Sequence, residues 1–253
     1  MRELKKEQVR SSFYGLIELI LSLGGIVLIA GVLCMFIVGV LLAADAVIGH
    51  WALTDALSET IDAGSDKALT FVALAASFLA YVCVGFAVLI AARFRGGQNW
   101  RDLIAWQPWS LWRNERRFWL IIGATFLYGF AADIALRHFY PQSEDWLTMP
   151  KDLVAAALLS LLAVVFAPVT EELVFRGWIF TNLRRNFSFA TALLASSVIF
   201  AGMHYESTHL YALAVFPVGL ALGALREIAG SIKPAIAFHA FNNFLACCLS
   251  LLD

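Results

Sequence analysis

The chain has 253 residues, of which 61% are apolar and only 15% are charged. A soluble domain averages about 45–50% apolar and about 25% charged residues, and a single soluble core of this size cannot bury so much apolar surface. The composition therefore indicates an integral membrane protein. It excludes a disordered chain, a disulfide-rich scaffold and a soluble nucleic-acid-binding protein.

Long apolar runs predict transmembrane helices, since about 20 apolar residues are needed to cross a bilayer. The runs cover residues 16–44, 68–92, 118–136, 153–169, 189–203, 210–225 and 232–252. None shows the alternation of a β-strand, and only helices and closed barrels satisfy the backbone inside lipid. We therefore expect an all-α polytopic transmembrane helix bundle with about seven spans.

Basic residues concentrate in alternate loops of this arrangement. Most of the 18 Lys and Arg residues lie before the first run, between the second and third, between the fourth and fifth, or between the sixth and seventh. The positive-inside rule then places the N-terminus in the cytoplasm and Asp253 outside. The loop at 93–117 is rich in Trp and Arg. Between two spans we interpret it as an interfacial segment that contacts lipid headgroups, not nucleic acid.

Polar residues at membrane depth gather in the second half of the chain. We therefore divide it into an N-terminal transmembrane region, 1–149, with about three spans, and a C-terminal core, 150–253, with about four. Ionisable residues inside a bilayer are costly, so they are functional candidates. The candidates are Glu171, Glu172, Arg176, His204, His239 and Asn243.

Helical spacing predicts how these side chains are arranged. Glu172 and Arg176 are four residues apart with the acid first, which is the favoured order for an ion pair. Glu171 is rotated by about 100° from Glu172 and can face elsewhere. Pro168, just before Glu171, is expected to kink the helix and make room for water.

Depth arguments bring the candidates to one level. Glu171 and His204 lie at similar distances on either side of the break near residues 186–188, roughly 25 Å from it. His239 and Asn243 lie roughly 15 and 20 Å beyond the turn near residues 229–230. We therefore expect a carboxylate, two imidazoles and an amide to line one intramembrane polar cavity.

Two kinds of chemistry fit this set. Glu171 and His204 could activate water as general bases, while His239 and Asn243 could donate hydrogen bonds to a developing oxyanion. Alternatively, Glu171, His204 and His239 could hold zinc with one position left open.

Three motifs resemble those of the CPBP intramembrane proteases. They are Glu-Glu-x-x-x-Arg at Glu171, Glu172 and Arg176; Phe-x-x-x-His at Phe200 and His204; and His-x-x-x-Asn at His239 and Asn243. That family includes the type II CAAX prenyl endopeptidases and Abi-like bacterial relatives tied to bacteriocin self-immunity. The resemblance covers residues 151–253.

The resemblance implies a conical helical bundle whose cavity is open to water and lipid. It also implies a glutamate-dependent endopeptidase in which Glu171 and His204 activate water and His239 and Asn243 form the oxyanion site. Glu172, Arg176 and Phe200 would support them. Catalysis without a metal is favoured, with zinc as the alternative.

The function expected is hydrolysis of a peptide bond in a membrane-associated peptide or protein, with CAAX-type processing as one form of it. The location expected is the bacterial cytoplasmic membrane, and no nucleic-acid partner is expected. The alternative is a non-catalytic scaffold or bacteriocin immunity protein that binds a peptide or regulates a membrane partner. Nothing in the chain specifies a prenyl group.

The predicted orientation can be tested with a reporter. A phosphatase that is active only outside the cytoplasm, fused after Asp253, should be active, because an odd number of spans carries the end of the chain across the membrane. A reporter active only in the cytoplasm, fused at the same place, should be silent. The reverse result would mean that the spans are miscounted.

Overall fold

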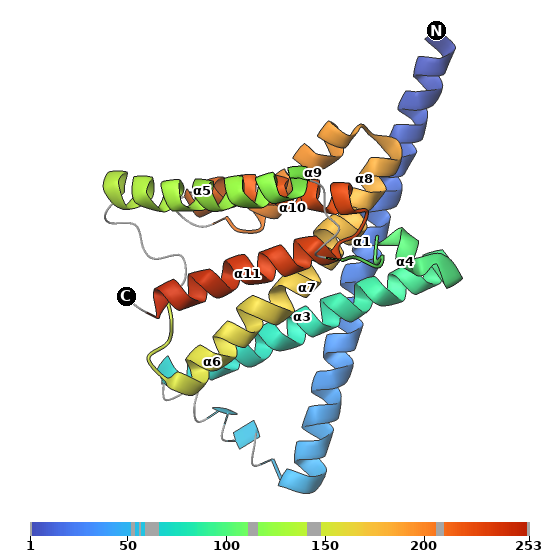
Figure 1. Ribbon diagram of the computed structural model, residues 1–253. Helices are drawn as coiled ribbons and strands as arrows, with labels where there is room; N and C mark the ends of the chain where they lie inside the picture. The colour runs from blue at the N-terminus through green and yellow to red at the C-terminus, as the bar shows by residue number, and fades with distance from the viewer. Residues whose placement is uncertain are drawn as a thin grey trace.

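The computed structural model describes residues 2–51, 54–55, 57–58, 66–110, 116–140, 148–205 and 210–251. All regular structure in these ranges is helical, which confirms the predicted all-α class. The principal helices are α1 (Arg2–Ala44), α3 (Asp66–Gly96), α5 (Arg116–Phe139), α9 (Phe189–Gly202), α10 (Leu210–Ala229) and α11 (Lys233–Ser250). Figure 1 shows α1 crossing the other long helices as a steep diagonal.

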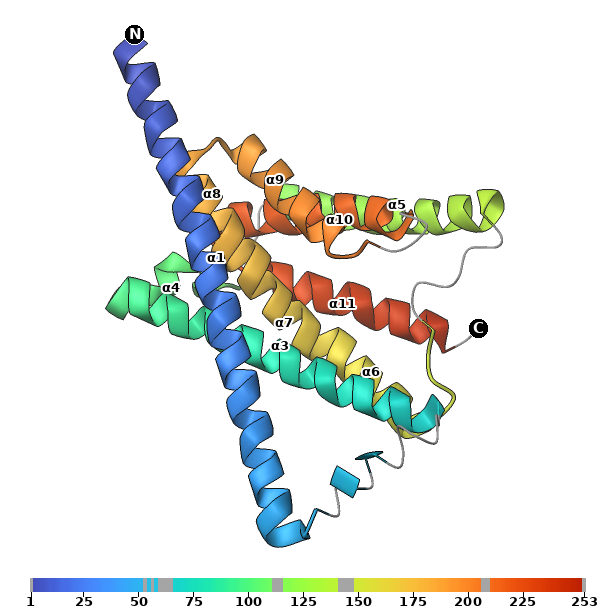
Figure 2. The same ribbon diagram turned by 180° about the vertical axis from the view of Figure 1, so that it is seen from behind.

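One continuous rod occupies the centre of the bundle. It consists of α6 (Leu153–Leu161), the π-helical segment η3 (Leu162–Phe166), α7 (Ala167–Glu172), the π-helical segment η4 (Leu173–Phe180) and α8 (Thr181–Asn186). Viewed from either side, α3 lies along α6 and α7 (Figures 1 and 2). The rod therefore receives contacts on several faces, which suits a helix that carries polar side chains through a membrane.

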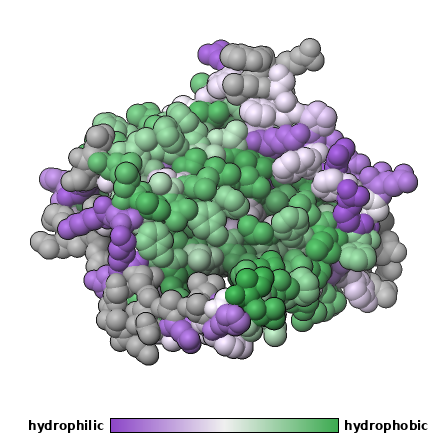
Figure 3. All heavy atoms as spheres, turned by 90° about the horizontal axis from the view of Figure 1, so that it is seen from below, coloured by the Kyte–Doolittle hydropathy of each residue, from purple (hydrophilic) through white to green (hydrophobic). Residues whose placement is uncertain are grey.

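Five helices in the described residues are long and apolar enough to cross a bilayer. They cover Ser11–Gly49, Leu69–Leu103, Arg116–Phe139, Leu153–Asn186 and Leu210–Ala229. Apart from residues at their ends, the described parts of all the predicted apolar runs are helical, but α9 has only 14 residues and α11, which contains His239 and two asparagines, is not among the five. Figure 3 shows an apolar face between polar edges, as expected for a protein embedded in lipid.

The helix ends agree with the predicted alternation of loops. In Figure 1, α4 (Trp100–Leu103) and α8 lie toward one end of the bundle, whereas the start of α6 and the end of α11 lie toward the other. The interfacial segment predicted at 93–117 contains α4, where Arg93 and Arg101 both lie against the Trp100 ring. Residues 111–115 of this segment lie outside the described ranges. Which end faces the cytoplasm remains a prediction.

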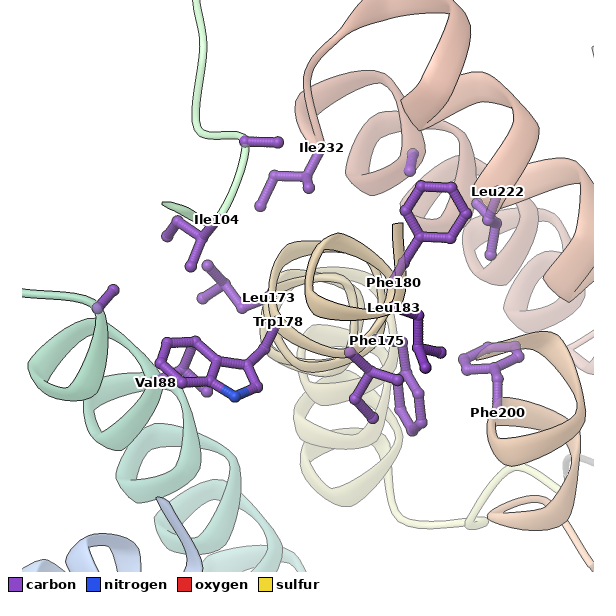
Figure 4. Close-up of a cluster of buried hydrophobic side chains, with 14 of the residues drawn as sticks. Val88, Ile104, Leu173, Phe175, Trp178, Phe180, Leu183, Phe200, Leu222 and Ile232 are labelled. Atoms are coloured by element: carbon purple, nitrogen blue, oxygen red, sulfur yellow. The ribbon is translucent and has the colours of Figure 1, made fainter. Parts of the chain in front are cut away.

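Large apolar side chains surround η4 and anchor the central rod. Trp178 and Phe180 are fully buried on different sides of η4. Figure 4 shows them among side chains from α3, α9, α10 and the segments before α5 and α11, such as Val88, Phe200 and Leu222. A close-packed shell of this kind leaves the rod little freedom to rotate.

An ion pair joins the starts of α3 and α6. The Lys67 ammonium lies 2.6 Å from Asp152, which also caps α6 by accepting hydrogen bonds from the N–H groups of Val154 and Ala155. The hydrogen bond from Lys67, followed by those from the backbone, holds the pKa of Asp152 below its usual range. The contact helps to set the register of α3 against the central rod.

Candidate functional site

Glu171 and Glu172 are the last residues of α7, between the two π-helical segments. A π-helical turn contains an extra residue and is frequent at functional sites, because it redirects the side chains that follow. Glu172 is completely buried, whereas the Glu171 side chain keeps 15% of its surface exposed. Neighbouring acids on one helix thus have different surroundings.

Glu172 belongs to a buried ion pair. Its Oε1 accepts a hydrogen bond of 2.9 Å from Arg176 Nη1, and neither side chain is exposed. Arg176 Nη2 donates a second bond of 2.9 Å to the carbonyl of Gly219 on α10. The structure thus contains the ion pair predicted from the spacing. Through Arg176, the pair also connects α10 to the central rod.

The ring of Phe200 on α9 contacts several of the predicted polar residues. The Arg176 guanidinium lies 4.2 Å from the centre of the Phe200 ring, a cation–π distance. The same ring contacts His204 and His239, with centroid separations of 4.7 and 5.8 Å. A Cβ added at Gly219 would meet Phe200 at 3.3 Å, so the glycine permits α10 to approach α9 closely.

Both histidines use Nδ1 for contacts that fix the ring. His239 Nδ1 lies 3.0 Å from Glu172 Oε1, and His204 Nδ1 lies 2.9 Å from the carbonyl of Phe200. Glu172 Oε1 and the carbonyl are both acceptors, so each Nδ1 must carry the proton and donate it. Each neutral ring therefore has its lone pair on Nε2.

Those two Nε2 atoms face Glu171. The Oε2 atom of Glu171 lies 4.0 Å from Nε2 of His204 and 3.9 Å from Nε2 of His239. This oxygen is buried and has no hydrogen-bond partner among the described residues. Separations near 4 Å are too long for direct hydrogen bonds, and a water molecule beside the three atoms can bridge them. Three of the four side chains expected to share one layer, the carboxylate and the two imidazoles, are thus brought together.

The zinc alternative requires the three side chains to lie closer together than they do in this structure. Ligand atoms about 2.0–2.1 Å from a tetrahedral zinc lie roughly 3.3 Å from one another, which is shorter than the 3.9 and 4.0 Å between Glu171 and the two imidazoles. In the described part of the chain, no three His, Cys, Asp or Glu side chains are placed to hold a metal ion.

Asn243 lies one turn after His239 but makes a different contact. Its Nδ2 donates a hydrogen bond of 2.8 Å to the carbonyl of Ala163 in η3. That carbonyl lacks its usual helical partners. The N–H of Ala167 goes to Leu162, and Pro168 has no N–H to give. Asn243 therefore satisfies the backbone group left open where the π-helical segment meets the proline.

Sequence reasoning missed Tyr81, which comes from α3 in the N-terminal half. Its hydroxyl donates a hydrogen bond of 2.9 Å to Glu171 Oε1. Tyr81 lies in an apolar run without polar neighbours, so local pattern gave no reason to single it out. Its position on the α3 face that contacts the central rod is a tertiary feature.

The fold and the site define a polytopic helical membrane protein with a buried acid–imidazole centre. Against protein-family models, residues 153–245 match the model described as Type II CAAX prenyl endopeptidase Rce1-like. No curated protein and no solved structure gives a match. The match to an Rce1-like domain at residues 153–245 supports the resemblance to the CPBP proteases that the three motifs predicted.

The role of Asn243 in supporting the backbone can be tested against Pro168. Asn243→Ala should lower stability by about 1–3 kcal/mol, because the Ala163 carbonyl loses its donor. In a Pro168→Ala background, residue 168 regains an N–H one π-helical turn from that carbonyl, so the same substitution should cost clearly less. Thermal unfolding in detergent measures both shifts. Equal shifts in the two backgrounds would contradict the assignment.

Proposed function

We propose that the protein is an intramembrane endopeptidase in which Glu171 is the general base. The convergence of Glu171 Oε2 with Nε2 of His204 and Nε2 of His239, at 4.0 and 3.9 Å, carries the proposal. An endopeptidase family model that covers the same residues supports it. A buried carboxylate beside the imidazole lone pair of His204 is suited to hold and deprotonate one water molecule.

In the proposed reaction, a water lies between Glu171 and His204. The water donates one hydrogen bond to each, and Glu171 takes a proton as the water oxygen attacks the peptide carbonyl carbon. The carbonyl electron pair moves onto oxygen. When the C–N bond breaks, Glu171 returns the proton to the leaving nitrogen, so the products are a carboxylic acid and an amine.

We propose that His239 and Asn243 donate hydrogen bonds to the oxyanion. Each can do so only if it has an N–H that is not already used. His239 donates Nδ1–H to Glu172, so its Nε2 becomes a donor only when the ring carries a second proton. Glu172 and Glu171, on either side of the ring, would stabilise that cation. Asn243 uses one N–H for Ala163, and an amide nitrogen has a second N–H to offer.

The proposed substrate is a membrane-associated peptide or protein. The site lies among helices that are apolar enough to span a bilayer, so its substrate must reach it from lipid or from a water-filled opening. The family description names CAAX prenyl endopeptidases, so a prenylated C-terminal peptide is the first probe. A plain peptide of the same sequence separates the contribution of the lipid group.

The proposal predicts that Glu171→Gln and His204→Ala each reduce cleavage about 10²–10⁴-fold. Cells producing the parent should accumulate membrane-protein fragments that cells producing either variant lack, as measured by proteomics of their membranes. Quenched peptides then give rates on the purified proteins. Glu18→Gln is the control, because Glu18 is exposed and pairs with Arg95 far from the site.

Identical fragments from parent and Glu171→Gln membranes would overturn the proposal and favour a non-catalytic binding role. Metal content is a separate check. One zinc per purified chain that is lost in His204→Ala would show that the water is activated by a metal. That result would contradict the mechanism above while leaving the peptidase activity in place.

A further inference from the structure

We propose that Tyr81 is a positioning residue for Glu171, so that the N-terminal half of the chain completes the peptidase site. This inference rests on the proposed function of Glu171. Residues 153–245, which match the family model, contain the carboxylate and both histidines, but the hydroxyl that holds the carboxylate comes from α3.

Two reciprocal hydrogen bonds join Tyr81 to α7. Its hydroxyl donates to Glu171 Oε1 over 2.9 Å, while its own carbonyl accepts a bond of 3.1 Å from the Thr170 hydroxyl. Successive residues of α7 thus bind the side chain and the backbone of a single residue of α3. Such a pair of contacts fixes both the separation and the register of the two helices.

The face of α3 around Tyr81 is shaped for this approach. Phe78, just before it, packs edge-to-face on Phe166 at 5.0 Å between ring centres. One turn after it, a Cβ added to Gly85 would lie 3.2 Å from the Thr170 hydroxyl. Positions 78, 81 and 85 have the three- and four-residue spacing of one helix face. Both ribbon views show α3 running beside α7 (Figures 1 and 2).

The hydroxyl matters because a glutamate carboxylate turns easily. The terminal torsion of Glu has broad, roughly two-fold preferences, so packing of the aliphatic chain alone does not orient the two oxygens. A bond from Tyr81 to Oε1 selects one orientation. It leaves Oε2, which faces Nε2 of both histidines, as the oxygen available to water.

Tyr81→Phe therefore tests the inference with a minimal change. Without the hydroxyl, the carboxylate spends time in unproductive orientations, so kcat should fall about 10–100-fold. Because this loss falls on the chemical step and not on substrate binding, the KM for a cleaved peptide should stay within about twofold of the parent value. The measurement is steady-state kinetics on the full chain, together with its melting temperature.

Tyr128→Phe is the matched control. The Tyr128 hydroxyl also joins two helices, donating over 3.2 Å to the carbonyl of Ala214 on α10, but it does not touch Glu171. This variant loses an interhelical hydrogen bond of the same kind and should keep the parent kcat. A Tyr81→Phe variant that keeps the parent kcat, or that loses activity only as much as Tyr128→Phe, overturns the inference.

A double variant separates failure of this inference from failure of the proposed function. Because Tyr81 acts through Glu171, adding Tyr81→Phe to Glu171→Gln should cause no further loss of residual cleavage, whereas independent sites would add their effects. Full activity of Glu171→Gln alone refutes the peptidase mechanism. An inactive Glu171→Gln with a fully active Tyr81→Phe refutes only the role of Tyr81.

Discussion

A buried carboxylate that must be neutralised without water constrains the whole site. Glu172 is completely enclosed, and an isolated ion in such a place costs several kcal/mol after relaxation. Arg176 and His239 both donate hydrogen bonds to its Oε1. Arg176 in turn donates a hydrogen bond to the Gly219 carbonyl and lies over the face of Phe200. The central rod, α9, α10 and α11 are joined by these contacts.

The orientation of the proposed reacting groups follows from that network. Because His239 donates its Nδ1–H to Glu172, the opposite nitrogen faces Glu171. His204 reaches the same arrangement through the Phe200 carbonyl. The rotation of about 100° between consecutive residues of α7 lets two glutamates serve different purposes, one in the buried ion pair and one facing the two imidazoles. The irregular backbone of η3 needs external partners, and Asn243 is one of them.

The sequence predicted the all-α class and the residues that meet, because both depend on periodicity and on the cost of burying polar groups. Intervals of four residues predicted the contacts Glu172–Arg176 and Phe200–His204, and helix rise predicted the shared level. Tyr81 could not be found this way, since it depends on how α3 packs on α7. The contact of Asn243 with Ala163 depends on a local change of helix type that sequence spacing does not reveal.

The site depends on Glu172 holding His239 with its proton on Nδ1. NMR of the protein with ¹⁵N-labelled histidine in lipid nanodiscs tests this protonation directly. The His239 signals are identified by their loss in His239→Gln. His239 of the parent protein should carry its proton on Nδ1, and in Glu172→Gln, where the carboxylate acceptor is gone, this Nδ1 should be free to lose its proton. A parent protein in which His239 carries its proton on Nε2 and has an unprotonated Nδ1 would contradict this role of Glu172.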